Sequence, residues 1–269
     1  MPEPQAGGSV APPAAAPDPA LVAAAAMVFV ADLAAPRLDA DTAHHLIDVL
    51  RLRPGELVVA ADGSGSWVPC RVASAATETD ARHRDPSAIL EPDGSVRVTP
   101  EARPRLTVAF APVKGDRPEL VVQKLTELGV DRIVPITTRR SVVRWEGERA
   151  TRALERLSRV AREASAQCRR TRLPQIGPVS SLGALASLAG DPPSLAHPGG
   201  APPSLDHPVI AIGPEGGWDD RELEEALPTV GLGPTVLRAE TAAIVAGTLL
   251  SSLRSVLIAP CATTLRGRN

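Results

Sequence analysis

The sequence of 269 residues contains no long hydrophobic run and only three cysteines. No run approaches the roughly 20 consecutive apolar residues that a membrane-spanning helix needs, so we expect no membrane segment. Cys70, Cys168 and Cys261 lie far apart, without the spacing of a metal site or a redox motif, and the histidines have no ligand spacing either. We therefore expect free thiols, no metal and a reduced, cytoplasmic environment.

Positive charge is missing from the first part of the chain. No lysine or arginine precedes Arg37, and Asp18 and Asp32 flank the apolar residues 21–30, which argues against a signal peptide. Residues 1–26 consist largely of alanine and proline and carry almost no large apolar side chains. Such a segment cannot bury enough surface to offset the entropy lost on ordering, so we predict a disordered tail.

Motifs for several common sites are also missing. No GxGxxG follows a predicted strand and no GxxxxGK[ST] occurs, so sites for dinucleotides and for P-loop nucleotides have no support. The GSG turn at residues 63–65 does not match the GxSxG nucleophile elbow of serine hydrolases. These three classes of site therefore have no basis in the sequence.

The pattern of predicted elements indicates two domains. Residues 27–101 contain short predicted strands separated by turn sequences, such as DGSGS at residues 62–66, and predict a small barrel with one helix. From residue 105 onward, predicted strands alternate with helices, which favours an α/β domain with a mainly parallel sheet. We therefore expect a tail over residues 1–26, a barrel over residues 27–101 and an α/β domain over residues 102–269.

The same patterns give approximate bounds for each element. In the barrel we expect strands at residues 27–30, 56–60, 67–72 and 95–98, and an exposed loop at residues 78–85. In the α/β domain we expect strands at residues 106–112, 132–136, 195–197, 209–213 and 235–237. We expect helices at residues 118–128, 148–167, 182–188, 219–227 and 241–258.

A glycine-rich turn follows one of these strands. The apolar run PVIA at residues 208–211 predicts a buried strand, and IGPEGGW at residues 212–218 follows it. In DDRE at residues 219–222, Asp219 can cap a helix and Glu222 can reach back to the cap. The turn presents backbone N–H and C=O groups without Cβ atoms, which suits close approach by a flat cofactor, although any tight turn between a strand and a helix uses glycine.

One stretch of the chain is strongly basic although the net charge is only −2. Residues 132–172 hold twelve arginines and four acidic side chains. Arginines recur there at helical spacing, at positions 149, 152, 156 and 159, and apolar residues occupy the opposite face of the predicted helix. A solvated surface is the simple alternative, but charge of one sign in an otherwise balanced chain favours contact with phosphates. Nucleic acid is therefore the expected partner.

A second signature, LGPTVLRAETA at residues 232–242, lies about one helix after the first. Together the two signatures resemble the paired cofactor loops of the RsmE-type ribosomal RNA uridine-N3 methyltransferases, a branch of the SPOUT superfamily. Further motifs resemble this family in the family's order: HHLIDVLR at residues 44–51 with Gly55, KGDR at residues 114–117, QKLTELGV at residues 123–130, Pro135 with Arg140 and Ser141, and EASAQ at residues 163–167 before Arg170. The resemblance covers most of the chain, residues 27–258.

The resemblance implies a fold and a cofactor. The family has a PUA-like β-barrel domain that positions RNA, followed by a SPOUT domain with a trefoil knot, a mainly parallel sheet and helices on both faces. S-adenosylmethionine binds in the knot, and LAHP at residues 195–198 is similar to the family's first cofactor loop. The implied cofactor-binding residues are Leu195, His197, Ile212, Gly213, Pro214, Glu215, Gly216, Gly217, Leu232, Gly233, Leu237 and Thr241.

The resemblance also implies the reaction, which is methylation of N3 of one uridine in small-subunit (16S) ribosomal RNA. Arg238 would bind the base edge or a phosphate, or stabilise negative charge on a uracil oxygen. Glu240 would act as the base, or would only favour the helix dipole. From the motifs and the basic stretch, the expected RNA-binding residues are Arg51, Lys114, Arg117, Arg140, Arg144, Arg152, Arg159 and Arg170.

One position departs from the family pattern. Thr235 stands where the family commonly has an arginine. This residue keeps open the alternative of a non-catalytic RNA-binding factor of ribosome assembly. A second alternative is a SPOUT enzyme that methylates another base or a ribose 2′-hydroxyl, although the LRAETA string at residues 237–242 and the leading barrel argue against it. The expected partner in the leading interpretation is ribosomal RNA or the small ribosomal subunit, and because family members are dimers we expect a homodimer.

Overall fold

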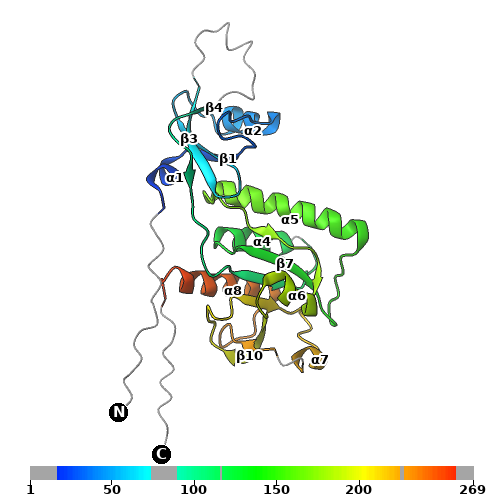
Figure 1. Cartoon of the computed structure of the whole chain (residues 1–269). Helices are drawn as coiled ribbons and strands as arrows, with labels where there is room; N and C mark the ends of the chain where they lie inside the picture. Colours follow the sequence, from blue (N-terminus) through cyan, green and yellow to red (C-terminus); the bar gives the residue numbers. More distant parts are fainter. Residues whose placement is uncertain (1–16, 74–89, 116, 225–226, 259–269) are drawn as a thin grey trace, which may run out of the picture.

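The structure is a computed structural model, and it describes residues 17–73, 90–115, 117–224 and 227–258. Figure 1 shows a smaller part in blue and cyan above a larger part in green to red. Residues 1–16 of the predicted tail and the loop expected at residues 78–85 lie outside the described residues. Within the described ranges, no helix is both long and apolar enough to cross a membrane.

The smaller part is built on a five-stranded sheet. Its strands are β1 (Ala26–Phe29), β2 (Leu57–Ala61), β3 (Ser66–Val72), β4 (Leu90–Pro92) and β5 (Arg97–Val98). β1 pairs with β2 in parallel and the other pairs are antiparallel, in the order β1-β2-β3-β4 with β5 beside β3. The helical segments are α1 (Pro19–Ala23), α2 (Ala40–His44) and the π-helical turn η1 (His45–Val49). The four predicted strands are thus confirmed, and β4 is additional.

Residues 17–26 differ from the predicted disordered tail. Asp18 accepts a hydrogen bond from the Ala20 N–H at 2.9 Å and pairs with Arg97 at 2.8 Å, which fixes the start of α1. Leu21 is 7% exposed and packs in an apolar cluster with β2 and β3. The prediction of disorder is therefore wrong for this segment, because a helix cap and a buried leucine compensate for its alanine-rich composition.

The larger part contains a seven-stranded sheet in which every pairing is parallel. Its strands are β6 (Thr107–Phe110), β7 (Arg132–Thr137), β8 (Gln175–Ile176), β9 (Ser180–Ser181), β10 (Ser194–Ala201), β11 (Val209–Ile212) and β12 (Thr229–Val230). The order is β12-β10-β11-β6-β7-β8, with β9 beside β7. The prediction of a mainly parallel α/β sheet is confirmed.

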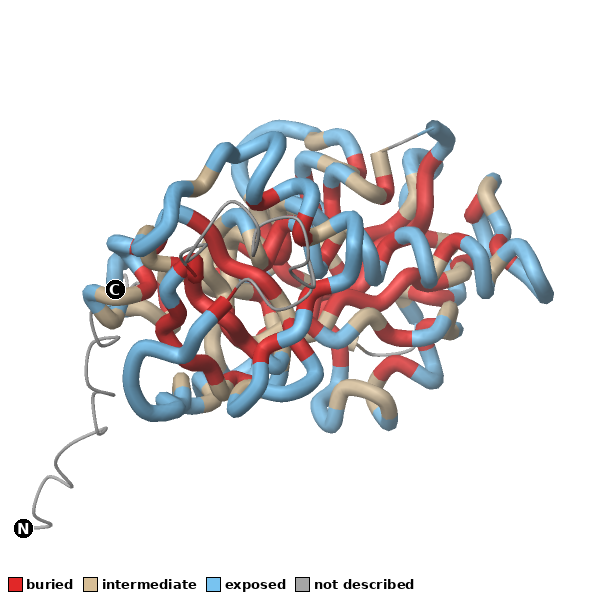
Figure 2. Tube along the Cα trace, turned by 90° about the horizontal axis from the view of Figure 1, so that it is seen from above, coloured by how far each residue is buried: buried red, intermediate tan, exposed pale blue. Residues whose placement is uncertain are grey.

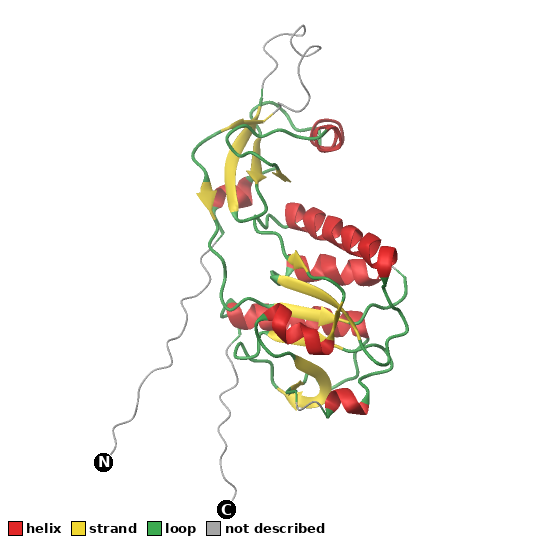
Figure 3. Ribbon diagram, turned by 45° about the vertical axis from the view of Figure 1, so that its right-hand side comes forward, coloured by secondary structure: helices red, strands yellow, loops and turns green. Residues whose placement is uncertain are grey.

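Helices cover both faces of this sheet (Figure 3). They are α4 (Arg117–Glu127), α5 (Gly147–Gln167), α6 (Leu182–Ala189), α7 (Asp220–Leu223) and α8 (Ala239–Arg254). Ile210 and Ile212 of β11 pack with α4, α5 and α8 in one core, whereas Val209 and Ala211 pack with α6 in another. Successive strand residues point to opposite faces, so one apolar strand serves both cores. Figure 2 shows that the buried residues, drawn in red, gather in the interior of the molecule.

Some predicted elements differ from the structure. Residues 235–237 do not form a strand; the edge strand is β12, which pairs with β10 through Ala196 and Val230. The chain leaves the sheet after Val230, and Val236 is 89% exposed with no strand beside it. α7 is also shorter than predicted, and α8 ends at Arg254. The trefoil knot stays a prediction.

Two arginines connect the two parts of the molecule: Arg162 lies near the C-terminal end of α5, and Arg169 follows this helix. The Arg162 guanidinium lies 4.8 Å from the centre of the Phe29 ring and donates to the Phe29 carbonyl at 3.1 Å. Arg169 donates to the carbonyls of Ala24 and Ala25 at 2.9 and 3.0 Å. The C-terminal end of α5 is therefore fixed against β1, and the N-terminal end points away from the smaller part (Figure 1).

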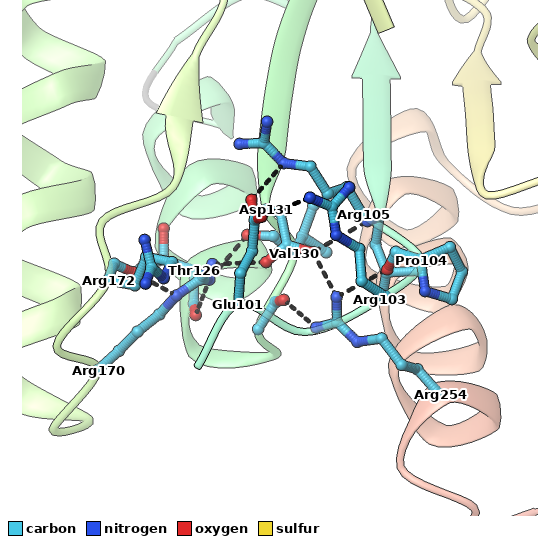
Figure 4. Close-up of polar contacts among 12 residues, drawn as sticks. Glu101, Arg103, Pro104, Arg105, Thr126, Val130, Asp131, Arg170, Arg172 and Arg254 are labelled. Atoms are coloured by element: carbon cyan, nitrogen blue, oxygen red, sulfur yellow. Dashed lines mark hydrogen bonds and ion pairs between the residues drawn. The ribbon is translucent and has the colours of Figure 1, made fainter. Parts of the chain in front are cut away.

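Asp131 precedes β7 and connects three segments at the amino edge of the sheet (Figure 4). Its carboxylate accepts a hydrogen bond from the Leu106 N–H at 2.9 Å and pairs with Arg170 at 3.3 Å and with Arg254 of α8. Arg170 also donates to the Val130 carbonyl at 2.7 Å. At this edge, the guanidinium groups of Arg170 and Arg254 therefore donate hydrogen bonds to groups within the protein.

The expectation that Arg170 binds RNA stays a prediction, and the structure gives this side chain partners within the protein. Its side chain is 14% exposed, and burial lowers the pKa of its guanidinium although Asp131 opposes this effect. A buried cation needs hydrogen-bond partners on the protein, and Arg170 has them in Asp131 and backbone carbonyls.

Cys70 and Cys168 are free thiols, as predicted, and Cys261 lies outside the described residues. Cys70 is fully buried in the barrel, and burial raises the pKa of its thiol to about 11. Such a thiol stays protonated near neutral pH and acts as a small apolar side chain in the core.

Candidate functional site

Three adjacent parallel strands, β12, β10 and β11, bring together the segments that the sequence singled out. Leu195 of β10 lies beside Ala211 of β11 and beside Thr229 of β12. Parallel strands have their carboxyl ends at the same edge, which is where open α/β sheets place their ligands. Residues 213–218 and 231–238, which follow β11 and β12, and the irregular part of β10 at residues 197–200 therefore lie at one edge of the sheet.

Two glycines that sequence reasoning did not single out allow β10 and β12 to approach closely. A Cβ atom on Gly200 would lie 2.5 Å from the Val230 backbone carbon, and one on Gly231 would lie 2.8 Å from the Gly200 oxygen. Backbone atoms cannot move away as a side chain could, so both positions require glycine. The register shift between Ala196 and Ala201 occurs at the same place.

Trp218 connects the turn after β11 to β10. Its indole N–H donates to the Ala196 carbonyl at 2.9 Å, and its ring lies 3.1 Å from where a Cβ on Gly213 would be. The Gly217 N–H donates to the Pro214 carbonyl at 2.8 Å, which closes the turn. The sequence contained Trp218 within the motif, but nothing in the pattern indicated that it joins two of the three segments.

The predicted helix cap at the end of this turn is confirmed. Asp219 and Glu222 form a capping box on α7, with the Asp219 N–H donating to Glu222 at 2.9 Å. Glu222 is 5% exposed, and its other oxygen accepts the Arg139 N–H at 2.9 Å. A buried carboxylate therefore ties the segment after β7 to the turn after β11.

Arg140 supports the same turn from outside. Its guanidinium donates to the Gly216 carbonyl at 3.3 Å and lies 3.5 Å from Asp219 and 3.8 Å from Asp220. We expected Arg140 to bind RNA, and the structure gives it partners within the protein.

The third segment leads into α8. Leu232 and Leu237 pack against the core formed with α4, α5 and α8, whereas Thr235 is exposed. Arg238 occupies the cap position of α8 without a side-chain cap, so the first N–H groups of the helix face the edge of the sheet. The Arg238 side chain is exposed and has no hydrogen bond or ion pair within the described part of the chain.

A small charge network lies where α4, α8 and the glycine turn meet. Arg117 donates to Glu215 at 3.0 Å and lies 3.7 Å from Oε1 of Glu240. The Glu240 side chain is 13% exposed, and its Oε2 is buried with no hydrogen-bond partner. A buried carboxylate oxygen without a partner is rare, and a bound ligand is one common partner for such a group.

The backbone of this edge is unobstructed at two of its glycines. Gly217 and Gly233 have φ values of +69° and +141°, and a Cβ on either would meet nothing within 4 Å. Positive φ favours glycine here, and the space beside the backbone is open. In contrast, the side chains of Leu195 and Ile212 are buried in the two cores, so only their backbone is available to a ligand. His197 is exposed, and its Nδ1 lies 2.8 Å from the Pro198 oxygen.

α5 has the two faces that the sequence predicted. Ala153, Leu157 and Ala161 are buried. The arginines at positions 149, 152, 156 and 159 are exposed on the other side. The amphipathic prediction is therefore confirmed, and the helix presents a row of cations to solvent.

The expected RNA-binding residues fall into two groups. Arg51, Lys114, Arg144 and Arg159 are exposed and make no side-chain hydrogen bond or ion pair with the rest of the described chain. Arg152 pairs only with the exposed Glu148, at 3.7 Å. In contrast, Arg117, Arg140 and Arg170 have the internal partners given above.

Comparison with known proteins identifies the family. Residues 100–251 match the model of the RNA methyltransferase domain, and residues 38–79 match that of the RNA methyltransferase PUA domain. The ribosomal RNA small subunit methyltransferase E of Mycobacterium bovis is 32% identical over 226 residues, which cover 78% of this chain and 83% of the relative. The Bacillus subtilis protein of the same name is 26% identical over 228 residues, 77% of this chain and 86% of the relative.

A solved structure agrees with these sequence matches. A methyltransferase from Legionella pneumophila, in complex with its bound cofactor SAM, is 26% identical and superposes with a TM-score of 0.66 over 84% of this chain and 96% of that chain. The chain therefore belongs to the family of RNA methyltransferases that contains the ribosomal RNA small subunit methyltransferases E.

Proposed function

We propose that this protein transfers a methyl group from S-adenosylmethionine to N3 of one uridine in the RNA of the small ribosomal subunit. The observation that carries the proposal is the meeting of three motif segments at the carboxyl edge of one parallel sheet, in a chain of the RNA methyltransferase family. The Mycobacterium relative is named for the same class of substrate, and the Legionella structure holds SAM.

The residues at the carboxyl edge fit this cofactor. The open backbone at Gly217 and Gly233 would accept a flat ring, and the turn from Gly213 to Gly216 would offer N–H and C=O groups. Leu232, Leu237 and Thr241 would complete the enclosure. S-adenosylmethionine supplies an electrophilic methyl group, so the protein must orient the acceptor and accept its proton.

Two side chains at the start of α8 fit those tasks. Uracil N3 carries a weakly acidic proton, and Oε2 of Glu240 is a buried acceptor without a partner. Arg117 holds the other side of the Glu240 carboxylate at 3.7 Å. Arg238, exposed at the cap of the same helix, would stabilise the negative charge that develops on a uracil oxygen when the proton leaves.

The basic surface supports RNA as the substrate. Arg144, Arg152 and Arg159 present unburied guanidinium groups near or along α5, and Arg51 lies on the smaller part. These residues would contact phosphates, and the PUA-like part would help to position the RNA.

The proposed enzyme is a homodimer. Val236 before α8, and Val256 and Leu257 after it, are large apolar side chains exposed by 89%, 45% and 77%. A subunit contact would cover such residues. Light scattering would test this point: we expect the mass of two chains, and the mass of one chain would contradict the proposed dimer.

Labelled S-adenosylmethionine and small ribosomal subunits from cells that lack this protein provide the test. After incubation with the full chain, the RNA is digested and its nucleosides are separated by mass spectrometry. We expect labelled 3-methyluridine. A different labelled nucleoside would keep the methyltransferase but overturn the N3 assignment. RNA binding without any transfer would favour the non-catalytic assembly factor.

A further inference from the structure

A pocket of about 430 Å³ opens beside the N-terminal half of α5, and we name it the α5 pocket. Its lining includes four cations, from Lys114, Arg149, Arg152 and Arg156. The volume is within the range of natural ligand sites, and a single nucleotide is small enough to enter.

The cations of this pocket are mostly available to a ligand. Lys114 and Arg149 have no ion pair with any other described residue, and Arg152 has only the exposed Glu148 at 3.7 Å. Arg156 is held in place by Glu119 of α4. None of the described residues that line the pocket is acidic. The α5 pocket therefore attracts an anion, and its guanidinium groups match the geometry of a phosphate.

Buried apolar residues also line the pocket. Val113, Trp145 and Ala153 are 9%, 7% and 7% exposed, and all three belong to the core beneath α5. A lining of this kind suits the apolar face of a nucleobase, as in proteins that bind single-stranded RNA. A lining that combines cations with an indole points to a ligand that has both a phosphate and a flat ring.

The α5 pocket lies at the same edge of the sheet as the proposed cofactor segments. Val113 follows β6, and β6 runs beside β11, where the Ala111 N–H donates to the Ile212 carbonyl at 3.0 Å. Arg117, three residues after Lys114, contacts Glu215 of the glycine turn and Glu240 of α8. A chain of RNA that reaches the proposed acceptor site can therefore continue into this pocket.

We propose that the α5 pocket binds one nucleotide of the single-stranded substrate RNA that flanks the methylated nucleotide. Its phosphate lies against Arg149 and Arg152, and its base lies against Trp145. The assignment rests on the proposed function for the identity of the RNA, but the pocket's preference for a nucleotide of a single strand can be tested without methyl transfer.

The first test measures the affinity of the full chain for a fluorescent single-stranded oligouridylate at several salt concentrations. The double variant Arg149→Gln, Arg152→Gln removes two cations from the pocket. The matched control, Arg103→Gln with Arg105→Gln, removes two arginines that pair with Glu101 at the amino edge. We expect the pocket variant to bind about tenfold more weakly and to lower the slope of log K against log salt by about 0.7 for each lost phosphate contact. The control should match the wild type.

Equal weakening in both double variants, or no weakening in the pocket variant, would overturn the assignment. In a transfer assay the pocket variant should raise KM for the RNA while kcat and the affinity for S-adenosylmethionine stay unchanged. If the wild-type protein transfers no methyl group, the proposed function fails, whereas the salt slopes still decide whether the pocket binds RNA.

The second test locates the nucleobase of the bound nucleotide. An oligomer that contains 4-thiouridine is bound to the wild-type protein, irradiated and digested with trypsin. We expect the cross-link on the peptide of residues 145–149, which contains Trp145. Cross-links only to other peptides would overturn the position of the base, and full competition by inorganic phosphate would show an anion site that does not select nucleotides.

Discussion

At the amino edge of the α/β sheet Arg170 and Arg254 turn inward, whereas at the carboxyl edge Arg149 and Arg238 point to solvent. The first pair shares the Asp131 carboxylate and donates to backbone carbonyls, and the side chains are 14% and 12% exposed. The second pair makes no ion pair within the described part of the chain. Arginine therefore stabilises the structure at the amino edge, whereas at the carboxyl edge these two arginines are exposed and can bind a ligand.

The difference shows what makes an arginine structural or functional. A guanidinium that is removed from water must find acceptors inside the protein, and once it has them few of its five N–H donors are left for a ligand. An exposed guanidinium contributes little to stability but retains its donors. Changes at the amino edge should therefore alter folding, and changes at the carboxyl edge should alter binding and catalysis.

The largest effect should come from Asp131→Ala at the amino edge. The change leaves Arg170 and Arg254 without their shared carboxylate and the Leu106 N–H without its acceptor. We expect the free energy of unfolding to fall by about 3–5 kcal/mol, measured by urea denaturation. Glu101→Ala, which removes partly exposed pairs at the same edge, should cost at most about 1 kcal/mol. Similar losses in the two variants would contradict the distinction.

At the carboxyl edge Arg238→Gln should reduce catalysis without affecting folding. If Arg238 stabilises charge on the uracil oxygen, kcat for methyl transfer should fall about 100-fold. The free energy of unfolding should change by less than about 0.5 kcal/mol, because the side chain is exposed. Arg221→Gln on α7 removes a similar exposed cation and should transfer methyl groups at the wild-type rate. An effect on KM alone would assign Arg238 to RNA binding instead.

Gly200→Ala tests the backbone geometry of the carboxyl edge. The added Cβ would lie 2.5 Å from the Val230 backbone carbon, so β10 and β12 must separate. We expect a loss of about 1–3 kcal/mol in stability and a weaker affinity for S-adenosylmethionine by calorimetry. Gly183→Ala in α6, where a Cβ meets nothing within 4 Å, is the control and should leave this affinity unchanged. If Gly200→Ala left the affinity for S-adenosylmethionine unchanged, the contact between β10 and β12 would not be needed for cofactor binding.

The smallest effect should come from Thr235→Arg, which introduces the arginine that the family resemblance led us to expect at this position. Thr235 is exposed in the segment before α8, so an added cation can reach a phosphate without displacing a neighbour. We expect binding to single-stranded RNA to tighten about threefold at low salt, with unchanged stability. Weaker binding would mean that this position faces something other than the RNA backbone.

Elements with a strong local pattern could be predicted from the sequence. Continuous apolar runs placed β6, β7 and β11, helical spacing placed α5, and DDRE placed the cap of α7. The resemblance to a known family singled out three segments as the proposed cofactor site, and the parallel strands bring these segments together. These features depend on neighbours in the chain, which a sequence shows directly.

Other features depend on contacts between distant residues. Arg170 looks like its exposed neighbours in the sequence, and only Asp131 and the backbone carbonyls make it structural. β12 has two residues and pairs with β10, a contact that the local sequence does not contain, so the strand predicted at residues 235–237 was wrong. Gly200 and Trp218 act through contacts with Val230 and Ala196 that no local pattern contains.

Hydrogen exchange with and without S-adenosylmethionine tests the central claim most directly, because it locates the cofactor site without requiring the RNA substrate. The account predicts slower exchange in residues 197–200, 213–218 and 231–241 at the carboxyl edge, and no change in residues 101–106 and 128–132 at the amino edge. Protection that is absent from the three carboxyl-edge segments, or that is strongest around Asp131, would contradict it.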